Sequence, residues 1–138
     1  MPTVYAASSA TLSKWAADVG LSKHVYKVGV IAEGKAKDAA AALNEEGFAG
    51  VADWKPLAGR EVDEADEDAL LDRLSNKEKA VDPTYYPKVR GARGLIRVKV
   101  TNVENSMLVA KAMAGEVERD MKVKPADIGN YLIDNALG

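Results

Sequence analysis

Two short apolar segments, each with a tyrosine, precede an alanine-rich helix in the first third of the sequence. Tyr5 lies in the first segment, a strand expected over Thr3–Ala7, and the second segment is the β-branched run His24–Ile31. The helix is expected over Lys35–Glu46, because the glycine at Gly47 is a typical C-terminal stop. Strands that alternate with single helices restrict the chain to a sheet with helices packed on it.

The rest of the chain continues this alternation and places it in the α+β class. Two further strands are expected, over Gly50–Leu57 and Arg93–Val100. The second alternates apolar and polar residues, which predicts one face on the core and the other in water. Helices are expected over Leu12–Val19 and Glu64–Ala80, from the capping-box pair Thr101 and Glu104 to about Asp120, and from Pro125 onward. We predict one domain over residues 1–138, a small, mostly antiparallel sheet of about three to four strands flanked by helices.

The composition excludes several classes of function. The chain has no cysteine, so disulfide bonds, thiolate nucleophiles and metal sites built from its own thiolates are absent. No apolar run approaches the ~20 residues of a membrane span, and the N-terminus lacks the pattern of a secretory signal. We therefore expect a cytoplasmic protein without a membrane partner, and no pattern indicates a cofactor or a bound metal.

The charges are unevenly distributed, although the formal net charge is only −2. Seven acids lie between Glu61 and Asp72, and seven basic residues follow between Lys77 and Lys99. Such a reversal is consistent with a phosphate-facing surface beside a repelling one, or with ordinary solvated faces, and both interpretations stay open. The basic residues are Lys77, Lys79, Lys88, Arg90, Arg93, Arg97 and Lys99.

Other candidate features each have a plainer interpretation. The pair Gly91 and Gly94 has the spacing of a loop that approaches phosphate, but glycines before a strand more often form a turn. Tyr85 and Tyr86 are placed to stack on bases or to pack against the core. The single histidine, His24, is more typical of a hydrogen-bonded strand residue than of a catalytic base.

Three short motifs resemble the GIY-YIG nuclease domain, especially its short bacterial and phage relatives. The run Tyr26-Lys27-Val28-Gly29 is similar to the second motif of that family. The pair Asp53-Trp54 and the segment Gly94–Val98 follow in the family's order, so the similarity extends from about Tyr5 to Val100. The resemblance implies the GIY-YIG fold, with Tyr5 and Tyr26 as catalytic candidates beside a metal-bound phosphodiester. Together with the β-rich run Val25–Ile31, it predicts that the two tyrosine segments pair as neighbouring strands and that Trp54 packs beneath the same sheet.

The sequence departs from this family where the chemistry needs particular side chains. A helical insertion over Ser8–Lys23 replaces the family's hairpin, and the following helix offers Lys35 and Lys37 in place of an arginine. No carboxylate stands just before Leu95, where the family has a metal-binding glutamate. Divalent cations such as magnesium need carboxylate oxygens, so these departures predict a degenerate nuclease site with little or no activity.

Two hypotheses of function remain. The first is a module that binds DNA or RNA without cutting it, with its contacts on one basic face. The second is a structural or interaction protein of a bacterial or phage assembly, either a homo-oligomer or bound to a protein partner. A fold alone does not decide between them. The residues predicted to form the nucleic-acid face are Tyr5, Tyr26, Lys88, Arg90 and Arg93.

Overall fold

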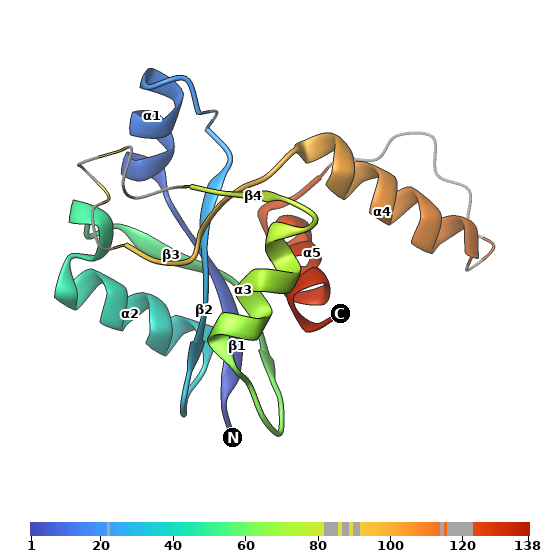
Figure 1. Ribbon diagram of the computed structural model, residues 1–138, viewed down its shortest axis with the longest axis horizontal. Coiled ribbons are helices and arrows are strands. Elements are labelled where there is room, and N and C mark those ends of the chain that lie inside the picture. Colours follow the sequence, from blue (N-terminus) through green and yellow to red (C-terminus); the bar gives the residue numbers. More distant parts are fainter. Residues whose placement is uncertain (22, 82–85, 87–88, 90–91, 114, 116–122) are drawn as a thin grey trace.

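Five antiparallel strands form the centre of the molecule (Figure 1). The computed structural model describes residues 1–21, 23–81, 86, 89, 92–113, 115 and 123–138, and within these the strand order is β3-β1-β2-β5-β4. The bounds are β1 Thr3–Ser9, β2 Val25–Ile31, β3 Trp54–Glu61, β4 Lys79–Ala80 and β5 Leu95–Arg97. The α+β class is confirmed. The described sheet has more strands than expected because Lys79–Ala80, predicted to end a helix, pairs with β5 as an edge strand.

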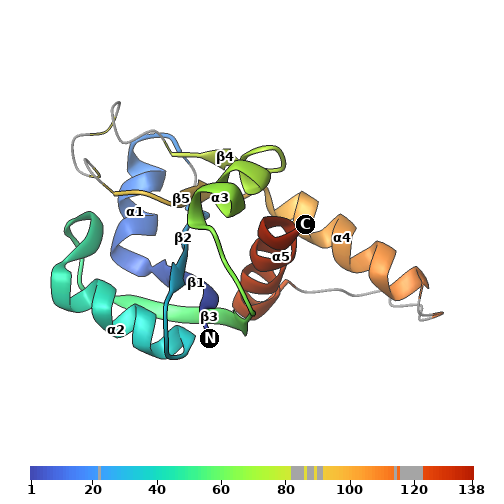
Figure 2. The ribbon, with the colours of Figure 1, turned by 60° about the horizontal axis from the view of Figure 1, so that its bottom comes forward.

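Helices cover both faces of the sheet. Their bounds are α1 Ala10–Asp18, α2 Ala36–Glu46, α3 Glu67–Ser75, α4 Val100–Met113 and α5 Pro125–Leu137, with a 3-10 turn, η1, at Phe48–Gly50. Figure 2 shows α1 and α2 on one side of the central strands and α3 and α5 on the other. Side chains alternate along β1, so Tyr5 and Ala7 pack toward α1 and α2, whereas Val4 and Ala6 pack toward α3 and α5. Both faces of the central strands are therefore buried.

The two tyrosine segments pair directly, as the sequence predicts. β1 and β2 run antiparallel with Tyr5 opposite Gly29. Trp54, which is 3% exposed, begins β3 opposite Ser9 and packs in the same cluster as Tyr5. The predicted helical insertion between β1 and β2 is α1, which Ser9 caps by accepting a hydrogen bond from the amide of Leu12.

Strand β5 corrects one prediction. The alternation over Arg93–Val100 indicated a strand with one solvated face, but Leu95 and Ile96 are both buried, one on each side of the sheet. Regular pairing covers only Leu95–Arg97, because the chain turns into α4 directly afterwards. Helices that cover both faces of the sheet thus bury residues that the local alternation predicted to be solvated.

Two further boundaries differ from the predictions. Helix α3 covers only part of Glu64–Ala80, because the side chain of Asp66 caps it by accepting a hydrogen bond from the amide of Asp68. Strand β3 begins at Trp54 rather than at Gly50, because η1 ends at Gly50 and residues 51–53 have no regular structure.

Helix α4 begins without the predicted capping box. It starts at Val100, so Thr101 lies inside the helix and Glu104 is exposed. A residue distant in sequence acts at this end instead: the buried carboxylate of Glu78 accepts a hydrogen bond from the amide of Lys99. The sequence pattern fits the motif, but a tertiary contact takes its place.

Helix α4 buries little of its described surface. Val103 is buried, but Met107 is half-buried and Ala110 is exposed. Figure 1 shows the helix projecting away from the sheet. Its predicted end near Asp120 lies outside the described residues. In the part of the chain that the structure describes, no helix is long and apolar enough to cross a membrane.

Candidate functional site

Tyr5 and Tyr26 lie on opposite faces of the sheet. Tyr5 is opposite Gly29 in the pairing of β1 and β2, and Tyr26 is three residues before that glycine. Successive residues of a strand point to opposite sides, so an odd spacing sends Tyr26 to the other face, among the side chains of α3 and α5. The expectation that both tyrosines line one phosphate-binding face is not met.

Lys27, and not Tyr26, lies beside Tyr5, where the sequence predicted the second tyrosine. It is two residues before Gly29, so its side chain shares the face of Tyr5, where it is only 5% exposed. A Cβ atom at Gly29 would lie 2.9 Å from the hydroxyl of Tyr5 and 3.1 Å from Nζ of Lys27. The glycine is therefore needed for these two polar side chains to approach the strand.

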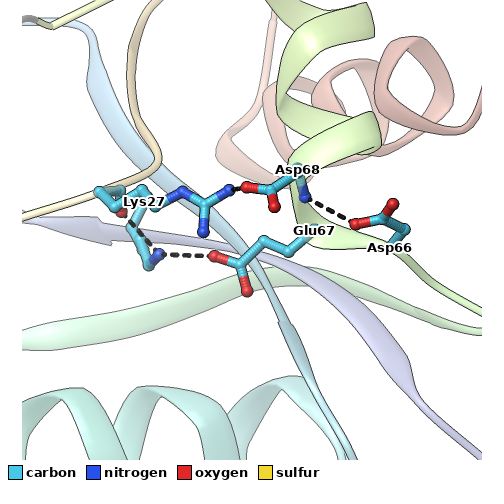
Figure 3. A network of polar contacts seen from close by, with 5 residues as sticks. Lys27, Asp66, Glu67 and Asp68 are labelled. Atoms are coloured by element: carbon cyan, nitrogen blue, oxygen red, sulfur yellow. Dashed lines mark hydrogen bonds and ion pairs between the residues drawn. The ribbon is translucent and has the colours of Figure 1, made fainter.

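A network of charges surrounds Lys27 (Figure 3). Its ammonium group donates a 2.7 Å hydrogen bond to the carbonyl of Arg93 and lies 3.8 Å from a carboxylate oxygen of Glu67. The guanidinium group of Arg93 pairs with Asp68, the next residue of α3. Arg93, predicted to contact phosphate, is thus already matched by an acid, and so is Lys27.

Burial sets the protonation behaviour of this cluster. It raises the pKa of Tyr5 to about 12, and the negative charges of Glu67 and Glu46 act in the same direction. Burial lowers the pKa of Lys27, although Glu67 opposes that shift. Tyr5 and Lys27 line a small cavity of about 220 Å³, with Glu46 and Phe48 on its wall. The cavity has no excess of positive charge, so its chemistry does not favour an anionic ligand.

Glu67 provides a carboxylate near Tyr5 that the sequence did not predict. It belongs to the acidic segment, and only the packing of α3 on the sheet brings it to Lys27. The GIY-YIG resemblance implies a divalent metal here, but the nearest group to Glu67 in the network is an ammonium cation at 3.8 Å. Among the described residues, no three or more acidic or histidine side chains are arranged to hold a metal ion. These residues do not fit a magnesium site.

Other sequence candidates occupy structural positions or lie outside the description. His24 accepts or donates a 3.0 Å hydrogen bond between Nδ1 and the hydroxyl of Tyr26, as expected for a strand histidine. Tyr86 packs edge-to-face against Trp15, with ring centres 5.7 Å apart, which favours the packing interpretation. The candidates outside the described residues are Tyr85, Lys88, Arg90 and Gly91.

A second concave surface, which we call the basic hollow, has a clear excess of positive charge. It has a volume of about 400 Å³ and lies where the end of α3, strands β4 and β5, and the start of α4 meet. Among its described lining residues, four cations and one carboxylate give a formal charge of +3. Its lining residues are Ser75, Asn76, Lys77, Glu78, Lys79, Arg97, Lys99 and Asn102.

The four cations of the basic hollow form no ion pair with any acidic side chain of the described residues. Lys79 and Arg97 are directly opposite each other in the pairing of β4 and β5. Lys77 and Lys99 are exposed at the ends of these strands. Across the described ranges, the ion pairs are those of Lys27, Arg60 and Arg93, so none involves the four cations of the hollow.

The one acid of the basic hollow is turned away from solvent. Glu78 is 4% exposed, and its carboxylate accepts hydrogen bonds from three donors. The donors are the amide of Lys99 at 3.1 Å, the side-chain amide of Asn102 at 2.9 Å and the hydroxyl of Tyr131 at 2.8 Å. Burial and this hydrogen bond raise the pKa of Tyr131. The carboxylate thus serves the fold and leaves the cations unneutralised.

Comparison with known proteins gives no match: no family model fits the chain, and no curated protein or solved structure is significantly similar to it.

Proposed function

We propose that the protein binds nucleic acid in the cytoplasm through the basic hollow, as a GIY-YIG-like domain without a working nuclease site. The observation that carries this proposal is the set of four cations without acidic partners around one concave surface. Lysine and arginine gain affinity for nucleic acid by neutralising phosphates and releasing counterions. We therefore place the proposed binding face at strands β4 and β5 rather than at Arg93.

The contrast between the two sites supports this choice. Of the cations that the sequence suggested for phosphate, the described one is Arg93, and it already pairs with a carboxylate of α3, as its neighbour Lys27 does. Phosphate binding there would have to replace an existing pair, whereas in the basic hollow it would replace only water. The order of β1, β2, α2 and β3 supports the GIY-YIG-like part of the proposal, because it is the order that the resemblance implies.

Binding of short DNA and RNA duplexes at several salt concentrations tests the proposal. If three or four cations meet phosphates, the logarithm of affinity should fall with the logarithm of salt at a slope near −3, because each contact contributes about −0.9. Fluorescence anisotropy with a labelled 16-base-pair duplex, at 50 to 200 mM salt, measures the slope. A slope near zero, or no binding at 50 mM salt, would contradict the proposal.

The protein is expected not to cut nucleic acid when magnesium or manganese is added. The reason is that the ammonium group of Lys27 lies beside Glu67, where a metal ion would need that carboxylate. Nicking of supercoiled plasmid, followed on agarose gels, measures this. A Glu67→Gln variant purified in parallel identifies contaminating nuclease. Metal-dependent nicking by the wild type that disappears in a Tyr5→Phe variant would overturn the prediction.

A role in an assembly has one observation in its favour. Three of the large apolar side chains that remain exposed belong to α4, with exposed fractions of 47% for Leu108, 59% for Val109 and 85% for Met113. Apolar side chains gathered on a projecting helix are typical of a surface that another protein covers. This observation supports the interaction hypothesis as the second candidate function.

The assembly role predicts self-association that depends on α4. The wild type should sediment faster as its concentration rises toward 100 μM, and a Val109→Glu variant should remain a monomer because a charge at a buried apolar contact is unfavourable. Sedimentation velocity measures both, with Lys55→Glu as the control on an exposed residue of β3. A wild type that stays monomeric over this range would exclude a homo-oligomer in it.

A further inference from the structure

The basic hollow gathers its charges around a point rather than along a line. Ligand pockets of proteins begin at roughly 300 Å³, so a hollow of about 400 Å³ suits one nucleotide better than a stretch of backbone. Along a strand, the phosphodiester charges are spread at one per ~3.4 Å of helix axis. Four cations that line one small hollow therefore match a concentrated anion.

The pairing of β4 and β5 independently favours an anion bound in the basic hollow. Lys79 and Arg97 face each other directly across the two strands. Directly opposed like charges destabilise a strand pair, and no acidic side chain of the described chain forms an ion pair with either. An anion held between them would remove the repulsion. The fold itself gains little from this arrangement, which favours a role in binding.

The chemistry of the donors indicates which anion. Arg97 offers a planar fork of N–H groups that suits two oxygens of one phosphate, and the three lysines offer ammonium donors. An internal phosphodiester carries one negative charge. A terminal phosphomonoester carries about −1.5 to −2 at pH 7 and has three strong acceptor oxygens, which is the better match to a formal charge of +3.

Glu78 holds the two halves of the hollow together. It follows α3 and lies just before β4, and its carboxylate binds the amide of Lys99 and the side chain of Asn102, which follow β5. The backbone that carries Lys77 and Lys79 is thereby held beside the chain that carries Lys99 before a ligand arrives. A backbone that is fixed in advance lowers the cost of bringing the cations together on binding.

We infer that the basic hollow binds a terminal phosphomonoester, carried by the end of a nucleic acid strand or by a free mononucleotide. This inference rests on the proposed function and narrows it, because it names the group that enters the hollow. It predicts a preference for phosphorylated strand ends over internal backbone.

Four oligonucleotides of one sequence test the inference: single strands of eight nucleotides with a 5′-phosphate, a 3′-phosphate, both, or hydroxyl groups at both ends. The fluorescent label is placed in the middle of the strand. We expect a terminal phosphate at one end to tighten binding about tenfold at 100 mM salt, the effect of an added charge-assisted contact. The preference should disappear in the Lys79→Glu/Arg97→Glu double variant and persist in Lys14→Glu/Lys55→Glu, which makes the same change of charge at exposed lysines elsewhere.

The outcomes separate the inference from the proposed function. Equal affinity for all four oligonucleotides would overturn the inference and leave nucleic-acid binding intact, whereas no binding to any of them would remove both. Displacement of the labelled strand by micromolar adenosine 5′-monophosphate would support the inference with a free nucleotide as the source. Displacement by phosphorylated strands alone would support it with a strand end as the source.

Discussion

Reversing the charges of Lys79 and Arg97 together is expected to lower nucleic-acid affinity at least about 100-fold. The two side chains are neighbours across β4 and β5 and line the same hollow. Glutamates at both positions remove two contacts with phosphate and place two negative charges beside the negatively charged phosphates of the nucleic acid. Each such repulsion costs about 1 to 4 kcal/mol at ~4 Å, from bulk water to a protein surface. Two repulsions and two lost attractions therefore cost at least about 4 kcal/mol, which is more than a 100-fold loss of affinity.

The matched control separates local contact from overall charge. Lys14→Glu/Lys55→Glu changes the net charge equally, at exposed residues of α1 and β3 far from the hollow in sequence. We expect its affinity to fall less than about threefold, because neither residue lines the hollow and salt screens exposed charges that do not contact the ligand. Binding would be measured by anisotropy at 100 mM salt, and folding by circular dichroism. Equal losses in the two double variants would mean that the hollow is not the binding surface.

Arg93→Glu tests the nucleic-acid face that was predicted from the sequence, for comparison with the basic hollow. The guanidinium group of Arg93 faces Asp68, so its reversal breaks a pair in an exposed setting. Such pairs contribute little to stability, and this cation is not available to phosphate without losing its partner. A loss of affinity as large as that of the Lys79→Glu/Arg97→Glu variant would place the binding face at Arg93 after all.

Local patterns in the sequence predicted the parts of the fold that depend on neighbouring residues. The β-branched run before Ile31 and the glycine at Gly47 are features of the chain itself, so the second strand and the helix after it could be placed. The pairing of β1 with β2 was predicted from the β-rich run Val25–Ile31 and the order of the family-like motifs, although helix α1 lies between the two strands. The α+β class needed no more than this alternation.

Contacts between distant segments could not be predicted in the same way. Glu67 meets Lys27 only because α3 packs on the sheet, 40 positions further along the chain. Glu78 replaces the capping box of Thr101 because a buried carboxylate reaches the start of α4 from another element. The face of Tyr26 also depended on such a contact, because its odd spacing to Gly29 is informative only once the register of β1 and β2 places Tyr5 opposite that glycine.

The glycine at Gly94 is expected to be the most sensitive single position of the sheet. Gly94→Ala should destabilise the protein by about 3 to 5 kcal/mol, a large part of the ~5 to 15 kcal/mol of a typical domain. A Cβ atom there would lie 2.4 Å from the carbonyl oxygen of Val28 and 2.9 Å from Nζ of Lys27. The first of these atoms is backbone of the central strand β2, so it cannot move aside as a flexible side chain can.

The clash would also disturb a hydrogen bond that joins the chain before β5 to the sheet. The amide of Val28 donates to the carbonyl of Gly94 at 2.8 Å. Moving Gly94 away to make room would lengthen this bond and shift the neighbouring carbonyl of Arg93, which accepts from buried Lys27. A buried ammonium group that loses its acceptor adds its own desolvation penalty to the steric one.

Gly20→Ala is a matched control, because Gly20 has the same φ angle as Gly94. Both glycines have φ of +82°, but a Cβ atom at Gly20 would meet nothing within 4 Å. The control therefore measures the conformational penalty alone, about 1 to 2 kcal/mol. Urea unfolding followed by tryptophan fluorescence gives both free energies. Since the two variants share the same φ and the same added atom, any excess loss in Gly94→Ala belongs to the contact with β2, and equal losses would show that this contact does not constrain the fold.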